Sequence, residues 1–271
     1  TIIPFYEEKF KSPYPGGYVK EPQCGLHEYV VSFDLNSLYP SLIMQYNISP
    51  ETLVTRLKDK VSIDDLLVGG ASQFGGYLDK TNCTIAANLC IYTKEKRGFL
   101  PSIMDRMYDD RTKYKKQMIE CKKEYEKTKD PRLVKEIARL DNIQMAKKIQ
   151  LNSAYGALGN KYFKYFDLRV AEGVTLTGQM VIQWAEKAMN KAMNGLIGGD
   201  KDYVIAIDTD SLYVNFGPLV DKLKPKNPVE FLDKVCKEHF ESVLSKCYED
   251  LFTKMNCHKP RMEMGREVIA D

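Results

Sequence analysis

Three carboxylates stand at the ends of very apolar segments, where they could bind a divalent cation. Asp34 ends the segment EYVVSFD, and Asp208 and Asp210 lie in the polar turn of DYVIAIDTDSLYVNF. Residues two apart on a strand point to the same side, so Asp208 and Asp210 could face one point. Hard cations such as Mg²⁺ prefer these oxygen ligands. The alternative for each residue alone is a strand cap or an ordinary turn residue.

A second set of polar residues falls on two predicted helices. Arg111 and Lys115 are four apart and share a face, as do Lys148, Asn152 and Tyr155. If the two helices are antiparallel, both sets can lie near one end of the pair. Cations and an amide at that place would suit a triphosphate. The alternative is a solvent-exposed face, with Tyr155 packed inward.

The elements that must position these residues indicate an α+β fold. A helix is predicted from Pro101 to about Lys129 with Ser102 as its N-cap. Asp130-Pro131 breaks it, and the next helix runs from about Arg132 to Tyr155 or Gly156, which makes an antiparallel hairpin. Strands are expected at 28–34 and on both sides of the turn at 208–211. We also expect helices at 36–46, 170–194 and 229–256, irregular chain over 1–28, and short strands and loops over 55–100.

Composition narrows the protein class. Among the 271 residues, positions 94–148 carry 17 Lys or Arg against 10 Asp or Glu, a local charge of +7 in a chain of net charge +3. A basic segment beside carboxylates fits an anionic substrate; a solvated helical face is the alternative. The seven cysteines form no CxxC pair, so disulfides and zinc are not expected. Neither a long apolar run nor a P-loop motif is present.

Three ordered motifs resemble those of family B DNA polymerases. Residues 34–41 (DLNSLYPS) resemble motif A, 148–156 (KIQLNSAYG) motif B, and 208–211 (DTDS) motif C. Further similarity at 47–52, 156–160, 165–169 and 262–270 looks like the replicative polymerases of T-even-type bacteriophages. The resemblance implies a palm with an antiparallel β-sheet flanked by helices, and a fingers domain made of a long antiparallel helical hairpin. The palm would occupy 1–100 with motif A and 158–271 with motif C, and the fingers 101–157.

The resemblance also implies residue roles. Asp34, Asp210 and Asp208 would be catalytic and, with the Leu35 carbonyl, would bind two Mg²⁺ ions, for which Mn²⁺ can substitute. Ser37, Leu38 and Tyr39 would hold the triphosphate and sugar, with Tyr39 excluding a 2′-hydroxyl. The remaining implied roles are triphosphate binding by Arg111, Lys115, Lys148 and Asn152, packing against the nascent base pair by Tyr155 and Gly156, and a nearby acidic group at Glu267. Two positions depart from the family pattern, Ile207 in place of Gly and Gly265 in place of Asp.

The function implied is template-directed addition of deoxynucleoside triphosphates to a primer 3′-hydroxyl, with pyrophosphate release. Primer–template DNA would be the partner, in the cytoplasm of a bacterial host and away from membranes. We expect the exonuclease and thumb to be absent, so that this is a core fragment or one chain of a split polymerase. A second chain would then supply the thumb, and a sliding clamp is a further expected partner. The alternative is a polymerase-like DNA-binding subunit without activity of its own, which loss of a metal-binding Asp would mark.

Overall fold

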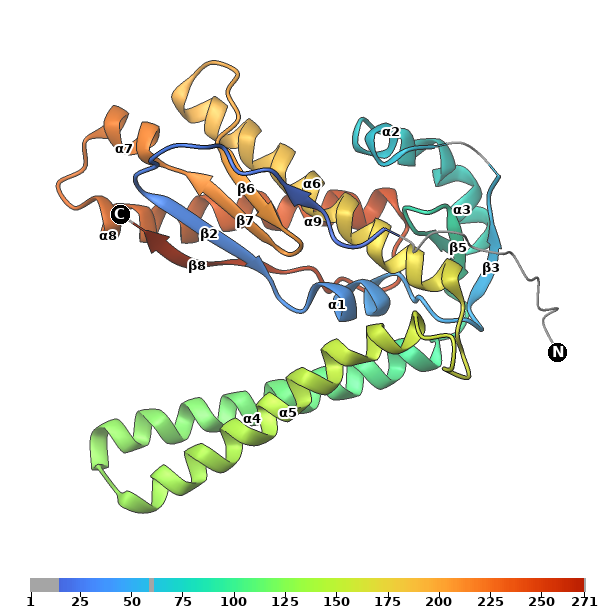
Figure 1. Ribbon diagram of the computed structural model, residues 1–271, viewed down its shortest axis with the longest axis horizontal. Helices are drawn as coiled ribbons and strands as arrows, with labels where there is room; N and C mark the ends of the chain where they lie inside the picture. The colour runs from blue at the N-terminus through green and yellow to red at the C-terminus, as the bar shows by residue number, and fades with distance from the viewer. Residues whose placement is uncertain (1–14, 59–60, 271) are drawn as a thin grey trace.

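The computed structural model describes residues 15–58 and 61–270, which form a two-part body and a projecting helical hairpin (Figure 1). The main sheet has the order β1-β6-β7-β2-β8, and all its neighbours are antiparallel. The bounds of its strands are β1 Val19–Lys20, β2 Val30–Leu35, β6 Val204–Asp208, β7 Ser211–Asn215 and β8 Met264–Ala270. The predicted α+β class with an antiparallel sheet is confirmed.

Alternation along β2 decides which of its residues reach the surface. Val31, Phe33 and Leu35 are fully or almost fully buried, whereas Asp34 is only partly buried. Successive side chains on a strand point to opposite faces, so Asp34 lies on the face away from the apolar core. Two long helices, α6 (Leu168–Ile197) and α9 (Glu241–Lys254), pack against strands of this sheet.

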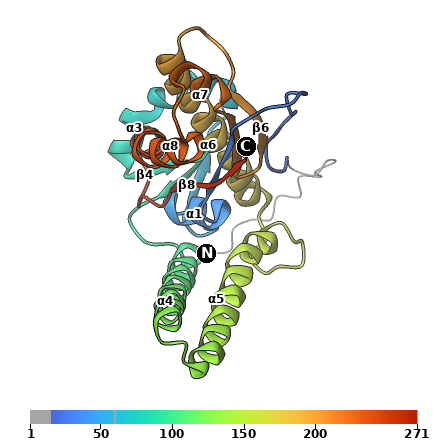
Figure 2. The ribbon, with the colours of Figure 1, turned by 90° about the vertical axis from the view of Figure 1, so that its left-hand side faces the viewer.

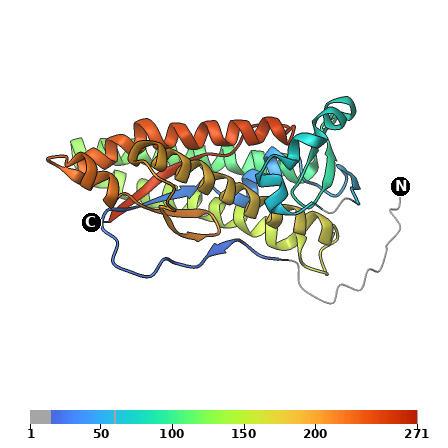
Figure 3. The same ribbon diagram turned by 90° about the horizontal axis from the view of Figure 1, so that it is seen from above.

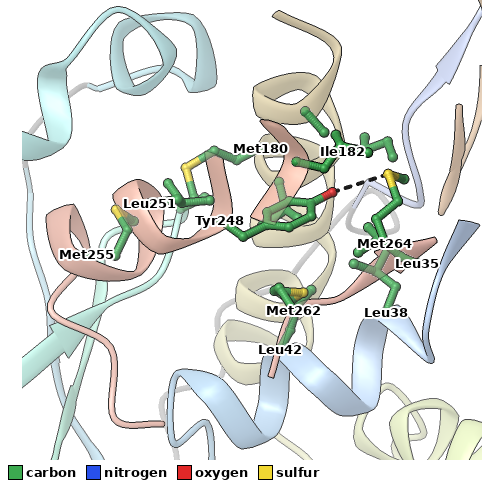
Figure 4. Close-up of a cluster of buried hydrophobic side chains, with 14 of the residues drawn as sticks. Leu35, Leu38, Leu42, Met180, Ile182, Tyr248, Leu251, Met255, Met262 and Met264 are labelled. Carbon is green, nitrogen blue, oxygen red and sulfur yellow. Dashed lines mark hydrogen bonds between the residues drawn. The ribbon is translucent and has the colours of Figure 1, made fainter. Parts of the chain in front are cut away.

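A methionine-rich core lies directly behind the strand that carries Asp34. Figure 4 shows Met180 of α6 beside Leu251 of α9, and Leu35 of β2 beside Met264 on the other side of the Tyr248 ring. Tyr248 uses its hydroxyl to donate a hydrogen bond to the sulfur of Met264, 3.5 Å away. Buried, close-packed side chains transmit strain and yield little. The core therefore gives β2 a rigid backing.

The predicted hairpin is present as α4 (Phe99–Thr128) and α5 (Pro131–Leu158), and it projects from the body (Figures 1 and 2). Lys129 ends α4 in the left-handed conformation, and Asp130 caps α5 by accepting a hydrogen bond from the Arg132 N–H. Pro131 fills the first helical position, as expected. The prediction that Ser102 caps α4 was wrong, because the N-cap is Gly98. The Ser102 hydroxyl instead donates a hydrogen bond to the Gly98 carbonyl inside the first turn.

A smaller unit follows α1 (Leu38–Gln45) and corrects the expectation for residues 55–100. Its sheet has the order β3-β5-β4, formed by Leu53–Arg56, Cys90–Thr93 and Cys83–Ile85. Its glycine-rich part is helical rather than a loop. A complete capping box at Ser62 and Asp65 starts the short helix that precedes it. The helices here are α2 (Ile63–Leu67), a 3₁₀ turn (Gly70–Phe74) and α3 (Gly75–Thr81).

The remaining helices agree with the sequence. The helix expected at 229–256 is α8 (Pro228–Val235), a π-helical turn (Cys236–Phe240) and α9, preceded by α7 (Gly217–Leu223). Irregular chain was expected over 1–28, and part of this range lies outside the described residues. Within the described part, Val19–Lys20 form the short strand β1. All seven cysteines are free, as predicted. Within the described ranges, helices long and apolar enough to cross a membrane are not found.

A charged node joins the base of the hairpin to the body. Asp105 of α4 accepts hydrogen bonds from Arg97 and Arg261, and Arg97 also donates to the Met44 carbonyl at the end of α1. Arg261 stacks over the Tyr108 ring with its guanidinium 5.4 Å from the centroid. The side chains of the three charged residues are only 15–20% exposed. This node therefore fixes how α4 leaves the body.

Replacing Asp105 with Ala should lower the free energy of unfolding by roughly 2–3 kcal/mol, because two partly buried arginines lose their counter-charge. Urea unfolding followed by circular dichroism measures the change. The control is Asp250→Ala, which removes an exposed pair with Lys254 and should cost less than about 1 kcal/mol. Equal losses in the two variants would contradict the anchoring role of the node.

Candidate active site

Two acidic residues more than 170 positions apart lie close together, Asp34 on β2 and Asp210 in the turn that leads into β7. Asp34 of β2 lies opposite Ser211 of β7, and the Ser211 hydroxyl donates to Asp34 Oδ1 at 2.8 Å. The Leu35 N–H donates to the Asp210 carbonyl at 3.0 Å. Motifs A and C thus share backbone and side-chain contacts on one part of the sheet.

A tight turn between β6 and β7 sets the direction of the second acidic pair. Asp208 ends β6 and is exposed, and Asp210 follows two residues later and is partly buried. Thr209 between them has φ of 54°, in the left-handed region that β-branched residues rarely adopt. The Asp210 N–H donates to the Asp208 carbonyl across 2.6 Å. The two carboxylates that flank the turn residue Thr209 therefore differ in burial.

Crowding of negative charge perturbs Asp210. Burial is the main cause that raises the pKa of its carboxyl to about 6, and the charges of Asp34, Asp208 and Glu267 raise it further. A hydrogen bond to its own backbone opposes the rise. When burial and like charges raise the pKa of a carboxyl, a nearby cation stabilises its ionised form. The site around Asp210 therefore favours binding of a cation.

A β-bulge brings Glu267 toward this group. On β8, Arg266 pairs with Phe33 and Val268 with Ser32, so Glu267 is an extra residue between the two pairs. Bulges of this kind re-aim side chains, and Glu267 is one of the charges that act on Asp210. Gly265, where the family often has Asp, lies opposite Asp34 and brings no side chain.

Both helices of the hairpin contact the motif A turn. Ser37, the N-cap of α1, has φ of 54°, and its hydroxyl accepts a hydrogen bond from Arg111 of α4 at 3.4 Å. The rings of Tyr39 and Tyr155 lie 4.5 Å apart between centroids, which joins α1 to α5. Leu38 beside them is buried in the core. The turn after β2 is therefore the place where sheet and hairpin meet.

Four members of the predicted set are not drawn into contact with the carboxylates. Lys115, Lys148, Asn152 and Gly156 are exposed on the hairpin. Triphosphate binding by Lys115, Lys148 and Asn152 and packing of Gly156 against the nascent base pair stay predictions, as do the roles of the other predicted site residues.

Two residues that support the site are not among the predicted site residues. One is Ser211, whose hydroxyl stands next to Asp210 in the sequence and donates to Asp34. Gly178 of α6 was not singled out; a Cβ there would lie 3.3 Å from the Tyr39 ring. A glycine inside an amphipathic helix signals this kind of close packing.

The donor set can be tested against a divalent ion. Within the described ranges, no three His, Cys, Asp or Glu side chains converge into a complete metal-ligand cluster. Asp34 and Asp210 supply two neighbouring carboxylates, and an ion bound by both would take its remaining ligands from water and substrate. Mg²⁺ is commonly bound by one or two carboxylates plus substrate phosphates, so the residues present fit such an ion.

Comparisons with known proteins agree with the motifs. The family model of DNA polymerase family B matches residues 1–256. The DNA-directed DNA polymerase of Escherichia phage RB69 is 31% identical over 99% of this chain and 34% of the phage protein, and that of Enterobacteria phage T4 is 32% identical over 99% and 35%. DNA polymerase 1 of Pyrococcus abyssi is 33% identical over 82% of the chain and 24% of its own length. The chain thus spans about a third of the phage relatives.

Asp210→Asn should stabilise the metal-free protein in a pH-dependent way. Because the folded-state pKa of about 6 lies above the ordinary value of 3.8, ionised Asp210 destabilises the fold above pH 6. The gain in melting temperature should be full above pH 6 and fade as the pH falls toward 4. Thermal melts in chelator measure it, with Asp200→Asn in an exposed loop as the control. A melting temperature unchanged at pH 7.5 would contradict the crowding of charge.

Proposed function

This chain belongs to DNA polymerase family B, and on that basis we propose that it is the catalytic core of a template-directed DNA polymerase. The reaction would add deoxynucleoside triphosphates to a primer 3′-hydroxyl and release pyrophosphate. The observation that carries the proposal is the proximity of Asp34 on β2 to Asp210 in the turn just before β7, beside a second turn that both hairpin helices contact.

The carboxylates divide the work at the reacting centre. Asp34 and Asp210 would bind two Mg²⁺ ions, for which Mn²⁺ can substitute. The Leu35 carbonyl and the exposed Asp208 carboxylate are further proposed metal ligands. When bound, the ions would acidify the primer hydroxyl and stabilise the leaving pyrophosphate. Ser211 keeps Asp34 oriented by donating to one of its oxygens. Phosphoryl transfer depends mainly on such positioning and charge neutralisation.

The hairpin and the motif A turn would together hold the incoming nucleotide. Arg111 already lies at Ser37, so its guanidinium is within reach of a triphosphate placed at the start of α1. Lys115, Lys148 and Asn152 are exposed along the hairpin and free of burial costs. Cations on a projecting element can approach the phosphates by a small rotation, which is how closing motions complete many active sites.

The two tyrosines would shape the base-pair end of the site. Tyr39 lies close to Gly178 of α6, where a Cβ would come within 3.3 Å of its ring. In the proposal this ring lies under the sugar and excludes a 2′-hydroxyl, while Tyr155 and Gly156 pack against the nascent base pair. Since the Tyr39 and Tyr155 rings are in contact, a nucleotide must move Tyr155 to enter.

The wider setting belongs to the same proposal. Substrates would be primer–template DNA and deoxynucleoside triphosphates, and the place of action the cytoplasm of a bacterial host. A thumb would come from a longer protein or a second chain, with a sliding clamp as a further partner. The second candidate function is a DNA-binding subunit inactive on its own, and the retention of Asp34, Asp208 and Asp210 argues against it.

Primer extension on a recessed duplex with Mg²⁺ and all four deoxynucleotides tests the proposal. Wild-type protein should extend the primer, Asp210→Ala should lose at least about 10³-fold in rate because a required ligand is gone, and Asp200→Ala should match wild type. Extension by Asp210→Ala at the wild-type rate would contradict the proposed centre. Duplex binding without extension by wild type would favour the DNA-binding subunit.

Lys148→Ala should raise KM for the nucleotide about tenfold or more and leave the Kd for primer–template almost unchanged, because a charge-assisted phosphate contact is lost. Single-nucleotide incorporation and fluorescence anisotropy measure the two constants. Lys135→Ala, on the same helix but nearer the tip, is the matched control. A similar increase in KM for the nucleotide and in Kd for primer–template would indicate that Lys148 contacts the DNA backbone instead.

A further inference from the structure

A short N-terminal segment lies over the turn that carries Asp208 and Asp210. We name residues 16–20 the N-terminal strap; Figure 3 shows this stretch of chain along the side of the molecule away from α9. Val19 pairs with Asp208, and Lys20 pairs with Ile207. The Tyr18 carbonyl accepts a hydrogen bond from the Thr209 N–H at 2.9 Å. The strap therefore continues the sheet up to the middle of the turn.

Gly17 packs so closely on the turn that no larger residue fits. A Cβ at Gly17 would lie 2.7 Å from Thr209 Oγ1 and 2.9 Å from Thr209 Cγ2. The backbone of Gly17 is not in the left-handed region, so the requirement is for space. Gly16, one residue earlier, has no atom within 4 Å of such a Cβ. An added Cβ would therefore meet Thr209 at Gly17 and open space at Gly16.

Both ends of the strap are fixed to the body. Lys20 donates to Glu186 of α6 at 2.6 Å, to Asp202, and to the Val204 carbonyl at 2.7 Å. At the other end, Gln179 of α6 donates to the Gly16 carbonyl at 2.7 Å. Since α6 packs against the main sheet, the strap is held by the same rigid layer that backs the catalytic strands.

The turn needs such a support. Thr209 is held with φ of 54°, a conformation that is costly for a β-branched residue and persists only where the surroundings impose it. Repulsion among Asp34, Asp208 and Asp210 also acts to spread the turn. The contacts of the strap with the backbone and side chain of Thr209 oppose both effects.

We propose that Gly17 and Tyr18 are positioning residues, which hold Thr209 in its left-handed conformation and so aim Asp210 at Asp34. The structural part of this inference stands on the contacts above, and its catalytic consequence rests on the proposed polymerase function. Neither residue touches the reacting atoms.

Hydrogen exchange of the Thr209 amide tests the structural part without any need for activity. Gly17→Ala should speed exchange in the peptide containing Thr209 by at least about tenfold, because the hydrogen bond to Tyr18 opens. Gly16→Ala should leave exchange unchanged. Thr209→Gly placed in the Gly17→Ala background should restore slow exchange, since it removes the colliding atoms and glycine tolerates positive φ.

The catalytic part has its own readout on the same four proteins. Gly17→Ala should raise the Mg²⁺ concentration for half-maximal primer extension and lower kcat, with KM for the nucleotide little changed, and Thr209→Gly should reverse both effects. Equal exchange in the Gly16→Ala and Gly17→Ala proteins would overturn the inference, as would failure of Thr209→Gly to suppress the defect. If wild type extends no primer, the exchange result still decides the role of the strap.

Discussion

The structure depends on the placement of unneutralised carboxylates on adjacent strands of one sheet. Asp34 and Asp210 stand beside each other only because β2 and β7 pair in one register, and a slip of one residue would turn Asp34 into the core. Burial of Asp210, and then its repulsion by Asp34, Asp208 and Glu267, favours proton uptake by its carboxylate. A rigid backing is needed against this repulsion, and the buried core between β2, α6 and α9 supplies it.

The same constraint explains why the molecule has two kinds of element. Negative groups lie on the sheet, whereas the positive groups proposed to meet the substrate lie on a hairpin joined to the body at its base. The node of Asp105, Arg97 and Arg261 fixes that base, and the contacts of Arg111 and Tyr155 with the motif A turn are smaller and separable. A hairpin that is fixed at its base and makes only a few contacts with the motif A turn is suited to rotation as a rigid unit.

Local signals in the sequence were sufficient for much of this fold. Carboxylates at the ends of apolar runs predicted β2 and the β6–β7 turn, and Asp130-Pro131 predicted the hairpin. Failures came where distant contacts decide. The glycines of 69–76 obscured a helical unit stabilised by its own packing, and Ser102 lies one turn inside α4 because Gly98 packs against Ser49 and begins the helix earlier. The bulge at Glu267 and the strap over Thr209 depend on strand pairing, which a single sequence does not encode locally.

Asp34 and Asp210 are proposed to form one cation-binding centre, which can be examined by Mn²⁺ titration followed by electron paramagnetic resonance. The titration is done with deoxynucleotide and a primer that lacks a 3′-hydroxyl. Asp34→Asn and Asp210→Asn should each weaken Mn²⁺ binding by at least about tenfold, whereas Asp200→Asn should bind as wild type does. Wild-type Mn²⁺ affinity in both site variants would rule out a shared centre.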